Sequence, residues 1–199
     1  MAHVAVMEPP AAAEQGAGVY NEKLGMWIFL GSEVMFFTAL IGAYIILRWG
    51  SATEWPDPTK TLAIGVTAFN TFVLICSSVS MVKAYAAAVH DDQPGLKKWL
   101  LITVLGGAMF VGIQAYEYTN LIHHGFRPSS GLFGSTFYTM TGFHGFHVTC
   151  GVISMMYVTL RAFQGKYAGG QYQGVETVGL YWHFVDLVWI ILFTIVYLI

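Results

Sequence analysis

Six side chains that can carry or share a proton lie inside long apolar stretches of this sequence. They are Glu33, Glu117, His144, His147, His183 and Asp186. A charged group at the centre of a bilayer costs about 2.5–3.5 kcal/mol on insertion scales, so such groups usually face protein or water and need partners. The residue types allow two kinds of chemistry: proton exchange by the acids, and coordination of a metal or a haem by the imidazoles.

Glu33 is the one charged residue within the first apolar run, residues 25–47. Its place near the middle of that run predicts a carboxyl group well below the membrane interface. One interpretation is a proton-exchanging or regulatory acid. The other is a neutral acid that hydrogen-bonds across helices and fixes their packing, and the residues alone favour this second role by a small margin.

His144 and His147 are spaced i, i+3, which places them on one face of a helix together with small residues. Such a face suits close packing against another helix. A structural metal site normally needs about four ligands, and the missing ones would have to come from His183, Asp186 or Glu117. A polar cluster that bridges helices is therefore the favoured interpretation of the two imidazoles.

His183 and Asp186 also share a face at i, i+3. An acid and an imidazole that pair inside a membrane lower the cost of burying both. Because the remaining groups lie at a similar depth, we hypothesise that five side chains converge in one polar seam. Its members would be Glu117, His144, His147, His183 and Asp186.

These groups are held in five apolar runs, at residues 25–47, 61–82, 99–122, 132–160 and 178–199. Each run is long enough to cross a bilayer as a helix. Membrane-spanning strands would be about ten residues long and would alternate in polarity, which these runs do not. The sequence predicts an all-α integral membrane protein: a flexible N-terminal arm, residues 1–22, and a bundle of five transmembrane helices, residues 23–199.

The composition agrees with a membrane protein, since 56% of the residues are hydrophobic and 10% are charged. A soluble domain carries about 25% charged residues. The net charge of −2 gives no reason to expect a nucleic-acid partner. Cys76 and Cys150 both fall within apolar runs, so we interpret them as small buried hydrophobes and expect neither a disulfide nor a metal site.

The basic residues are distributed unevenly between the two ends of the predicted bundle. One side would hold Lys23, Lys83, Lys97, Lys98, Arg161 and Lys166, and the other Arg48, Lys60 and Arg127. Since cytoplasmic loops carry the excess of Lys and Arg, this pattern predicts a cytoplasmic N-terminus and a C-terminus on the outer side.

Short words in each run, in order, resemble a known family. They are Gly-Ser-Glu-Val-Met-Phe-Phe (31–37), Phe-Asn-Thr-Phe-Val-Leu (69–74), Gln-Ala-Tyr-Glu-Tyr (114–118), Gly-Ser-Thr-Phe-Tyr (134–138), Thr-Gly-Phe-His-Gly-Phe-His-Val (141–148) and Tyr-Trp-His-Phe-Val-Asp-Leu-Val-Trp (181–189). Together they resemble subunit III of haem–copper terminal oxidases, which oxidise cytochrome c or quinol. The resemblance covers residues 22–199 and is to the short, five-helix bacterial form.

The resemblance implies an accessory subunit of the respiratory chain in the bacterial plasma membrane. Such a subunit has no redox centre or active site of its own, because the haem and copper belong to the catalytic partners. It packs against subunit I, holds structural phospholipids in a V-shaped cleft, and sustains proton uptake and enzyme lifetime. By position, Glu33 is the family's carbodiimide-reactive carboxyl group, and Arg161 contacts lipid phosphate. Lys166 stands where another member has His.

Three other interpretations remain open on the residues. One is a small proton or ion transporter that would use Glu33, Glu117 and Asp186 as carriers, although the internal repeats common in transporters are not visible. A haem-binding membrane anchor would use the imidazoles. A related branch of the family accompanies nitric oxide reductases, so that complex is an alternative parent.

Overall fold

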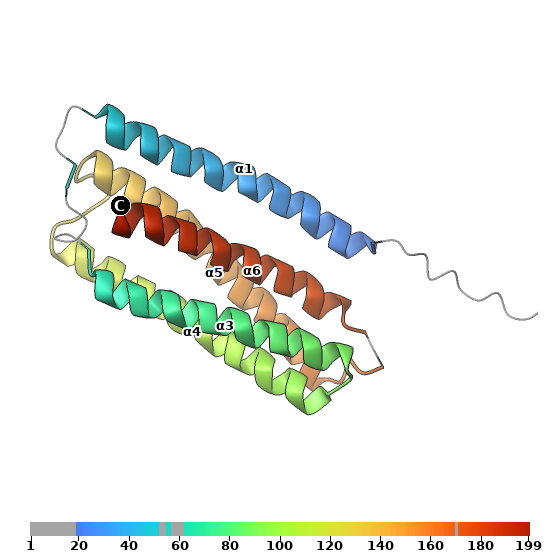
Figure 1. Ribbon diagram of the computed structural model, residues 1–199. Helices are drawn as coiled ribbons and strands as arrows, with labels where there is room; N and C mark the ends of the chain where they lie inside the picture. Colours follow the sequence, from blue (N-terminus) through green and yellow to red (C-terminus); the bar gives the residue numbers. More distant parts are fainter. Residues whose placement is uncertain (1–18, 52–54, 57–61, 170) are drawn as a thin grey trace, which may run out of the picture.

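The computed structural model describes residues 19–51, 55–56, 62–169 and 171–199, which form an all-helical bundle (Figure 1). The long helices are α1 (Asn21–Gly50), α3 (Ile64–Val89), α4 (Gln93–His123), α5 (Leu132–Phe163) and α6 (Gln173–Phe193). A π-helical turn, η1 (Thr194–Leu198), continues α6. In this described part of the chain, five helices are long and apolar enough to cross a membrane, so the predicted fold class is confirmed.

The helices run further than the apolar runs that indicate them. α3 continues to Val89, seven residues beyond the run at 61–82, and α4 begins at Gln93, six residues before the run at 99–122. The side chain of Asp92 caps α4, because its Oδ1 accepts the Gly95 backbone N–H at 3.1 Å. Of the predicted arm at residues 1–22, residues 1–18 lie outside the described part, and α1 already begins at Asn21.

Successive helices run antiparallel, so the start of α1, the α3–α4 turn and the α5–α6 connection lie at one end of the bundle (Figure 1). We call this the N-terminal end. α3 packs on α4, α4 on α5, α5 on α6, and α6 returns to α3, which closes a four-helix core. α1 packs on α6 and α5 from outside this core.

Two buried tryptophans of α6 fill the centre of the core. Trp182 donates its indole N–H to Ser77 Oγ at 3.1 Å, and Trp189 donates to Thr71 Oγ1 at 2.9 Å. Both hydroxyls belong to α3, so each indole satisfies its one polar atom across the α3–α6 contact. These bonds fix the rotation of α6 and therefore decide where its remaining polar side chains point.

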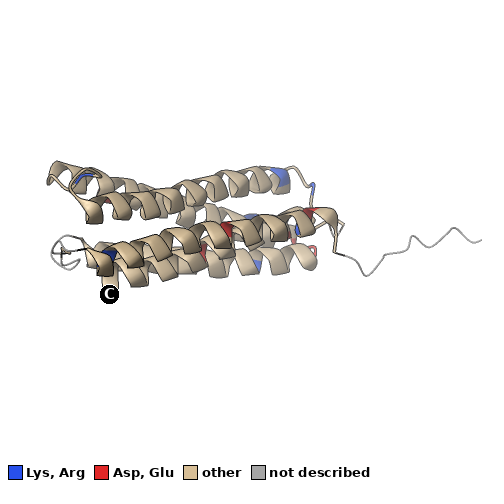
Figure 2. Ribbon diagram, turned by 90° about the horizontal axis from the view of Figure 1, so that it is seen from above, with Lys and Arg blue, Asp and Glu red and all other residues tan. Residues whose placement is uncertain are grey.

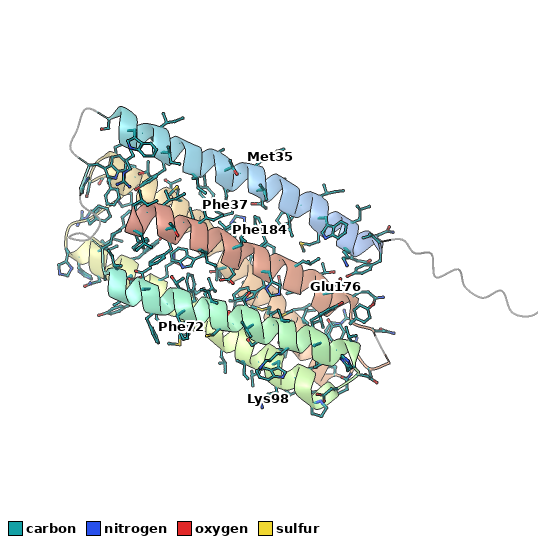
Figure 3. The ribbon with its side chains drawn as sticks, viewed as in Figure 1. Met35, Phe37, Phe72, Lys98, Glu176 and Phe184 are labelled. Atoms are coloured by element: carbon teal, nitrogen blue, oxygen red, sulfur yellow. The ribbon has the colours of Figure 1, made fainter. Side chains whose placement is uncertain are left out.

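α1 buries few side chains of its own. Phe37 and Tyr44 are its buried residues, and the ring centroids of Phe37 and Phe184 lie 6.4 Å apart. Figure 3 shows this aromatic contact between α1 and α6, with Met35 on the opposite side of α1. Met35 is 77% exposed, which fits a helix with an apolar outer face in lipid or against a partner.

The coloured Lys and Arg segments gather near the two ends of the bundle, away from its middle (Figure 2). At the N-terminal end several of them lie over aromatic rings. Lys83 Nζ is 4.4 Å from the centroid of the Trp99 ring, and Lys97 Nζ is 5.7 Å from that of Phe163. Basic and aromatic side chains together are typical of a membrane–water interface.

At this same end α1 is tied to the start of α6. Lys23 forms an ion pair with Glu176, and the Tyr20 hydroxyl donates to Glu176 Oε2 at 2.9 Å. Burial raises the pKa of Tyr20 to about 12, so the phenol keeps its proton and remains a donor. At the opposite end the Arg48 guanidinium donates to the backbone oxygen of Ile199. α1 is therefore tethered at both ends and loosely packed between them.

Candidate functional site

Glu33 of α1 meets His147 of α5 at membrane depth. Glu33 Oε2 lies 3.0 Å from His147 Nε2, and the two side chains are only 16% and 12% exposed. Within the described residues, this contact and the Lys23–Glu176 contact are the ion pairs that the structure contains. The partner of Glu33 is thus an imidazole from the helix that carries the two predicted histidines.

A second contact decides which nitrogen of the His147 ring carries a proton. His147 Nδ1 lies 2.7 Å from the carbonyl oxygen of Phe143. A carbonyl only accepts, so Nδ1 carries a proton and Nε2 is the nitrogen that faces the carboxyl group.

Aromatic rings enclose this pair. The His147 ring lies 5.2 Å from the ring of Phe37 and 6.2 Å from that of Phe36, and Phe36 packs edge-on against Phe143 at 5.1 Å. Apolar walls limit access of water and strengthen the interaction between the two polar groups. The arrangement fixes α1 against α5.

His144, one turn away, has a different environment. It is fully buried, its Nε2 donates to the Val185 carbonyl at 3.1 Å, and its ring stacks on Trp189 at 4.7 Å. Its Nδ1 is buried with no hydrogen-bond partner. Because Nε2 is used and the ring is stacked in the core, His144 acts as a polar packing group between α5 and α6.

His183 and Asp186 face α3 instead of pairing with each other. His183 Nδ1 lies 2.7 Å from Ser78 Oγ, and Asp186 is within reach of the same hydroxyl. Asp186 Oδ1 is buried and has no hydrogen-bond partner. Ser78 therefore links the two predicted residues through a third side chain.

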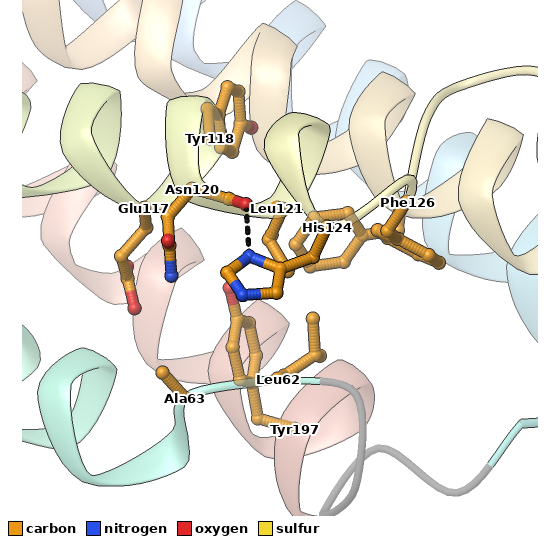
Figure 4. Close-up of a pocket in the computed structure, with 10 residues that line it drawn as sticks. Leu62, Ala63, Glu117, Tyr118, Asn120, Leu121, His124, Phe126 and Tyr197 are labelled. Atoms are coloured by element: carbon orange, nitrogen blue, oxygen red, sulfur yellow. Dashed lines mark hydrogen bonds between the residues drawn. The ribbon is translucent and has the colours of Figure 1, made fainter.

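Glu117 is held by the start of α3. Its Oε1 accepts a hydrogen bond from Thr67 Oγ1 at 2.7 Å. It lines a cavity of about 370 Å³ at the end of the bundle opposite the start of α1 (Figure 4). No member of the predicted polar seam is among its hydrogen-bond partners in the described part of the chain.

The five side chains predicted to converge therefore do not form one seam, and that prediction is wrong. They are divided among four sites: His147 with Glu33, His144 with Val185 and Trp189, His183 and Asp186 around Ser78, and Glu117 with Thr67. The physical reason is helical rotation. Three residues advance a helix by about 300°, so His144 and His147 point in directions about 60° apart, one into the core and one toward α1.

The two basic residues assigned to lipid lie in one cavity at the N-terminal end. Arg161 and Lys166 line a cavity of about 390 Å³ together with Glu22, Tyr157 and residues of the α5–α6 connection. Arg161 Nη1 donates to the Tyr157 hydroxyl at 2.9 Å, and its Nε is buried without a partner. The guanidinium thus has donors left for an anionic group.

A second cavity, of about 270 Å³, shares the lining residue Val178 with the first. It is also lined by Met26 and Phe29 of α1, Cys150 of α5 and Tyr181 of α6. The Tyr181 hydroxyl donates to the His147 carbonyl at 2.9 Å, which places this cavity next to the helix turn that carries His147. We call these two cavities the α1–α5–α6 groove.

Two of these four sites are completed by hydroxyl residues of α3, and sequence reasoning did not single them out as site residues. Thr67 and Ser78 lie in an uncharged apolar run. In such a run a hydroxyl is a natural partner for a polar group of another helix, because it satisfies that group without adding charge. The signal available in the sequence was that these hydroxyl residues lie in a run without charged residues.

Comparison with known proteins gives consistent matches along the chain. The profile of the family described as "Cytochrome c oxidase subunit III" matches residues 15–199. A "Probable cytochrome c oxidase subunit 3" of Mycobacterium tuberculosis is 42% identical over 177 residues, which cover 89% of this chain and 87% of that protein. The protein of that name from Nocardia farcinica is 40% identical over 201 residues and 97% of both chains. "Cytochrome c oxidase subunit 3" of Thermostichus vulcanus is 40% identical over 176 residues, 88% of this chain and 86% of the other.

Proposed function

The chain belongs to the cytochrome c oxidase subunit III family, and from that premise we propose that it packs against the catalytic subunit I and holds phospholipid beside it. Membership makes it an accessory subunit of a haem–copper terminal oxidase, a multi-pass membrane protein that works with the other subunits of that complex. Its contribution to the enzyme is then structural and protective.

The observation that supports lipid binding best is the α1–α5–α6 groove. Arg161 and Lys166 at its mouth suit a lipid phosphate, since a guanidinium donates several hydrogen bonds to phosphate oxygens. The apolar walls formed by Met26, Phe29 and Val178 suit an acyl chain. A chain lying there would cover the approach to the Glu33–His147 pair from that side.

The same pair supports a role in sustaining proton uptake. Glu33 Oε2 and His147 Nε2 lie 3.0 Å apart, and the ring of Phe37 packs against the imidazole. Lipid or partner surfaces that cover this pair limit its proton exchange with water. We propose that bound lipid and subunit I control this exchange and thereby maintain turnover of the catalytic subunit.

We further propose that the chain itself carries no haem or copper, which reside in the partner subunits. His144 Nε2, His147 Nδ1 and His183 Nδ1 each have a partner within the bundle. These imidazoles also point to different neighbours. They do not fit an axial ligand set for one haem, and they support a non-redox subunit.

The proposed orientation places the N-terminus in the cytoplasm of a bacterial cell and the C-terminus outside its plasma membrane. The end of the bundle that holds the start of α1 also holds Lys97, Lys98, Arg161 and Lys166, as expected for a cytoplasmic surface. Arg48 and Arg127 lie at the other end.

Lipid retention by the purified oxidase complex tests this proposal. Arg161→Leu should lower the amount of anionic phospholipid that survives detergent exchange by about tenfold, because a charge-assisted hydrogen bond contributes about 1.5–3 kcal/mol. Arg127→Leu, a matched loss of an exposed charge at the opposite end, should leave it unchanged. Mass spectrometry of the bound lipid provides the measurement. Equal retention in both variants would refute the Arg161 site.

A further inference from the structure

The cavity at the other end of the bundle is a second candidate binding site, separate from the α1–α5–α6 groove. It has a volume of about 370 Å³ and is formed where α3 begins, α4 ends and η1 closes the chain. Its lining residues are Leu62, Ala63, Glu117, Tyr118, Asn120, Leu121, His124, Phe126, Phe137 and Tyr197. A space of this size corresponds to a small organic molecule, since one water takes up about 30 Å³ of liquid.

Glu117 is the acidic group of this cavity, and its hydrogen-bonding capacity is mostly unused. A carboxylate offers about four acceptor positions, and Thr67 Oγ1 takes one of them. No Lys, Arg or His among the described residues forms an ion pair with it. The carboxylate lies about 9 Å before the end of α4, where an uncompensated charge is costly. A cation bound in this cavity would compensate it.

The other walls decide what kind of cation fits. The rings of Tyr197, Phe126 and Phe137 line the cavity, and Figure 4 shows Tyr197 below the opening with Glu117 to one side. Aromatic faces attract ammonium groups. A hard metal ion instead needs six or more oxygen ligands, and the described residues contain no group of three acidic, His or Cys side chains. The walls therefore favour an organic ammonium over a metal ion.

The rim adds hydrogen-bonding groups outside the helix. His124 Nδ1 donates to the Asn120 carbonyl at 2.8 Å, the bond drawn in Figure 4. Since Nδ1 is occupied, Nε2 of His124 is available at the rim, and the Asn120 side chain is exposed beside it. A ligand with polar atoms next to its ammonium group can use both.

We propose that this cavity binds an organic ammonium group, with Glu117 as its counter-ion and Tyr197 and Phe126 as its aromatic walls. The ammonium can come from the head group of an ethanolamine lipid or from a soluble amine, because the chemistry that the cavity recognises is common to both. The site is independent of the lipid groove, so either can fail without the other.

Protection of Glu117 from a membrane-soluble carbodiimide tests the site in the intact oxidase complex. The reagent modifies protonated carboxyl groups, and a bound ammonium both keeps Glu117 ionised and blocks access. The complex is placed in phosphatidylglycerol nanodiscs. Added ethanolamine or tetramethylammonium should suppress the adduct on the Glu117 peptide, whereas sodium at the same concentration should not. Glu33, in a separate site, is the internal reference, and its adduct should not change. Peptide mass spectrometry measures both.

Two comparisons complete the test. The first uses phosphatidylethanolamine nanodiscs without added amine. If Glu117 is protected from the carbodiimide there, the ligand is the lipid head group. If Glu117 is modified there, the ligand is a soluble amine. Tyr197→Leu keeps Glu117 but removes a ring, so the protecting amine concentration should rise about three- to tenfold. Equal protection by sodium, no protection by any amine, or a Glu117 that never reacts would each overturn the proposal.

Discussion

Glu33 Oε2 of α1 lies 3.0 Å from His147 Nε2 of α5, so the outermost helix of the bundle is joined to the core by a polar contact at membrane depth. α1 buries only Phe37 and Tyr44 along its described length, and its other polar ties are at its ends. Removing either member of the pair leaves the other in an aromatic enclosure without compensation. The contact therefore connects α1 to α5 inside the bundle.

A double-mutant cycle measures this connection. Glu33→Gln and His147→Gln should each destabilise the purified complex, and their effects should not add. The expected coupling is about 0.5–3 kcal/mol, the range for residues in direct contact. Thermal or denaturant unfolding of the two single variants and the double variant gives the value. Effects that add to within about 0.5 kcal/mol would contradict a direct pair.

The functional consequence of Glu33 is predicted to appear in the assembled enzyme. Glu33→Gln keeps the size and hydrogen-bonding reach of the side chain, so the complex should assemble at the wild-type level. An amide cannot exchange the proton, so turnover at alkaline pH should decline faster than in the wild type. Oxygen consumption followed over time gives the decline, and the wild-type complex assayed in parallel is the control. Normal proton uptake and normal lifetime would argue against proton handling by Glu33.

A third prediction concerns Gly107, where α4 packs closely against α6. A Cβ added at Gly107 would lie 2.6 Å from the Trp182 ring and 2.8 Å from Val152, whereas one added at Gly112 meets nothing within 4 Å. Gly107→Ala should therefore cost about 1–3 kcal/mol through overpacking. Gly112→Ala on the same helix should be neutral or should stabilise the fold by up to about 1 kcal/mol. Unfolding of the two variant complexes decides. A neutral Gly107→Ala would mean that α6 can shift away without loss.

The fold was predictable because the bilayer imposes a strong constraint. In lipid, backbone N–H and C=O groups must form hydrogen bonds within the protein, and a run of spanning length does this as a helix. The structure has helices at all five runs. Helix ends were less predictable, because polar residues such as Lys83 and Lys97 remain helical where they reach the interface. The capping signal at Asp92 and Pro94 would have placed the start of α4 correctly.

The candidate site was predictable only in part. The depth of Glu33 and of His147 followed from their positions in the apolar runs, but their pairing depends on the side of α5 against which α1 packs. The common face of His183 and Asp186 was clear, whereas their partner on α3, Ser78, was not. Helical phase predicts which residues share a face, and tertiary packing decides which faces meet.

Affinity purification of the tagged chain from its native membranes tests whether it is a subunit of a haem–copper oxidase. Haem–copper subunits should co-purify with it, the complex should show a Soret band, and the band should stay with the partners when this chain is dissociated. Recovery of the chain as a solitary oligomer, as expected of a transporter, would contradict membership of such a complex. So would a Soret band on the isolated chain.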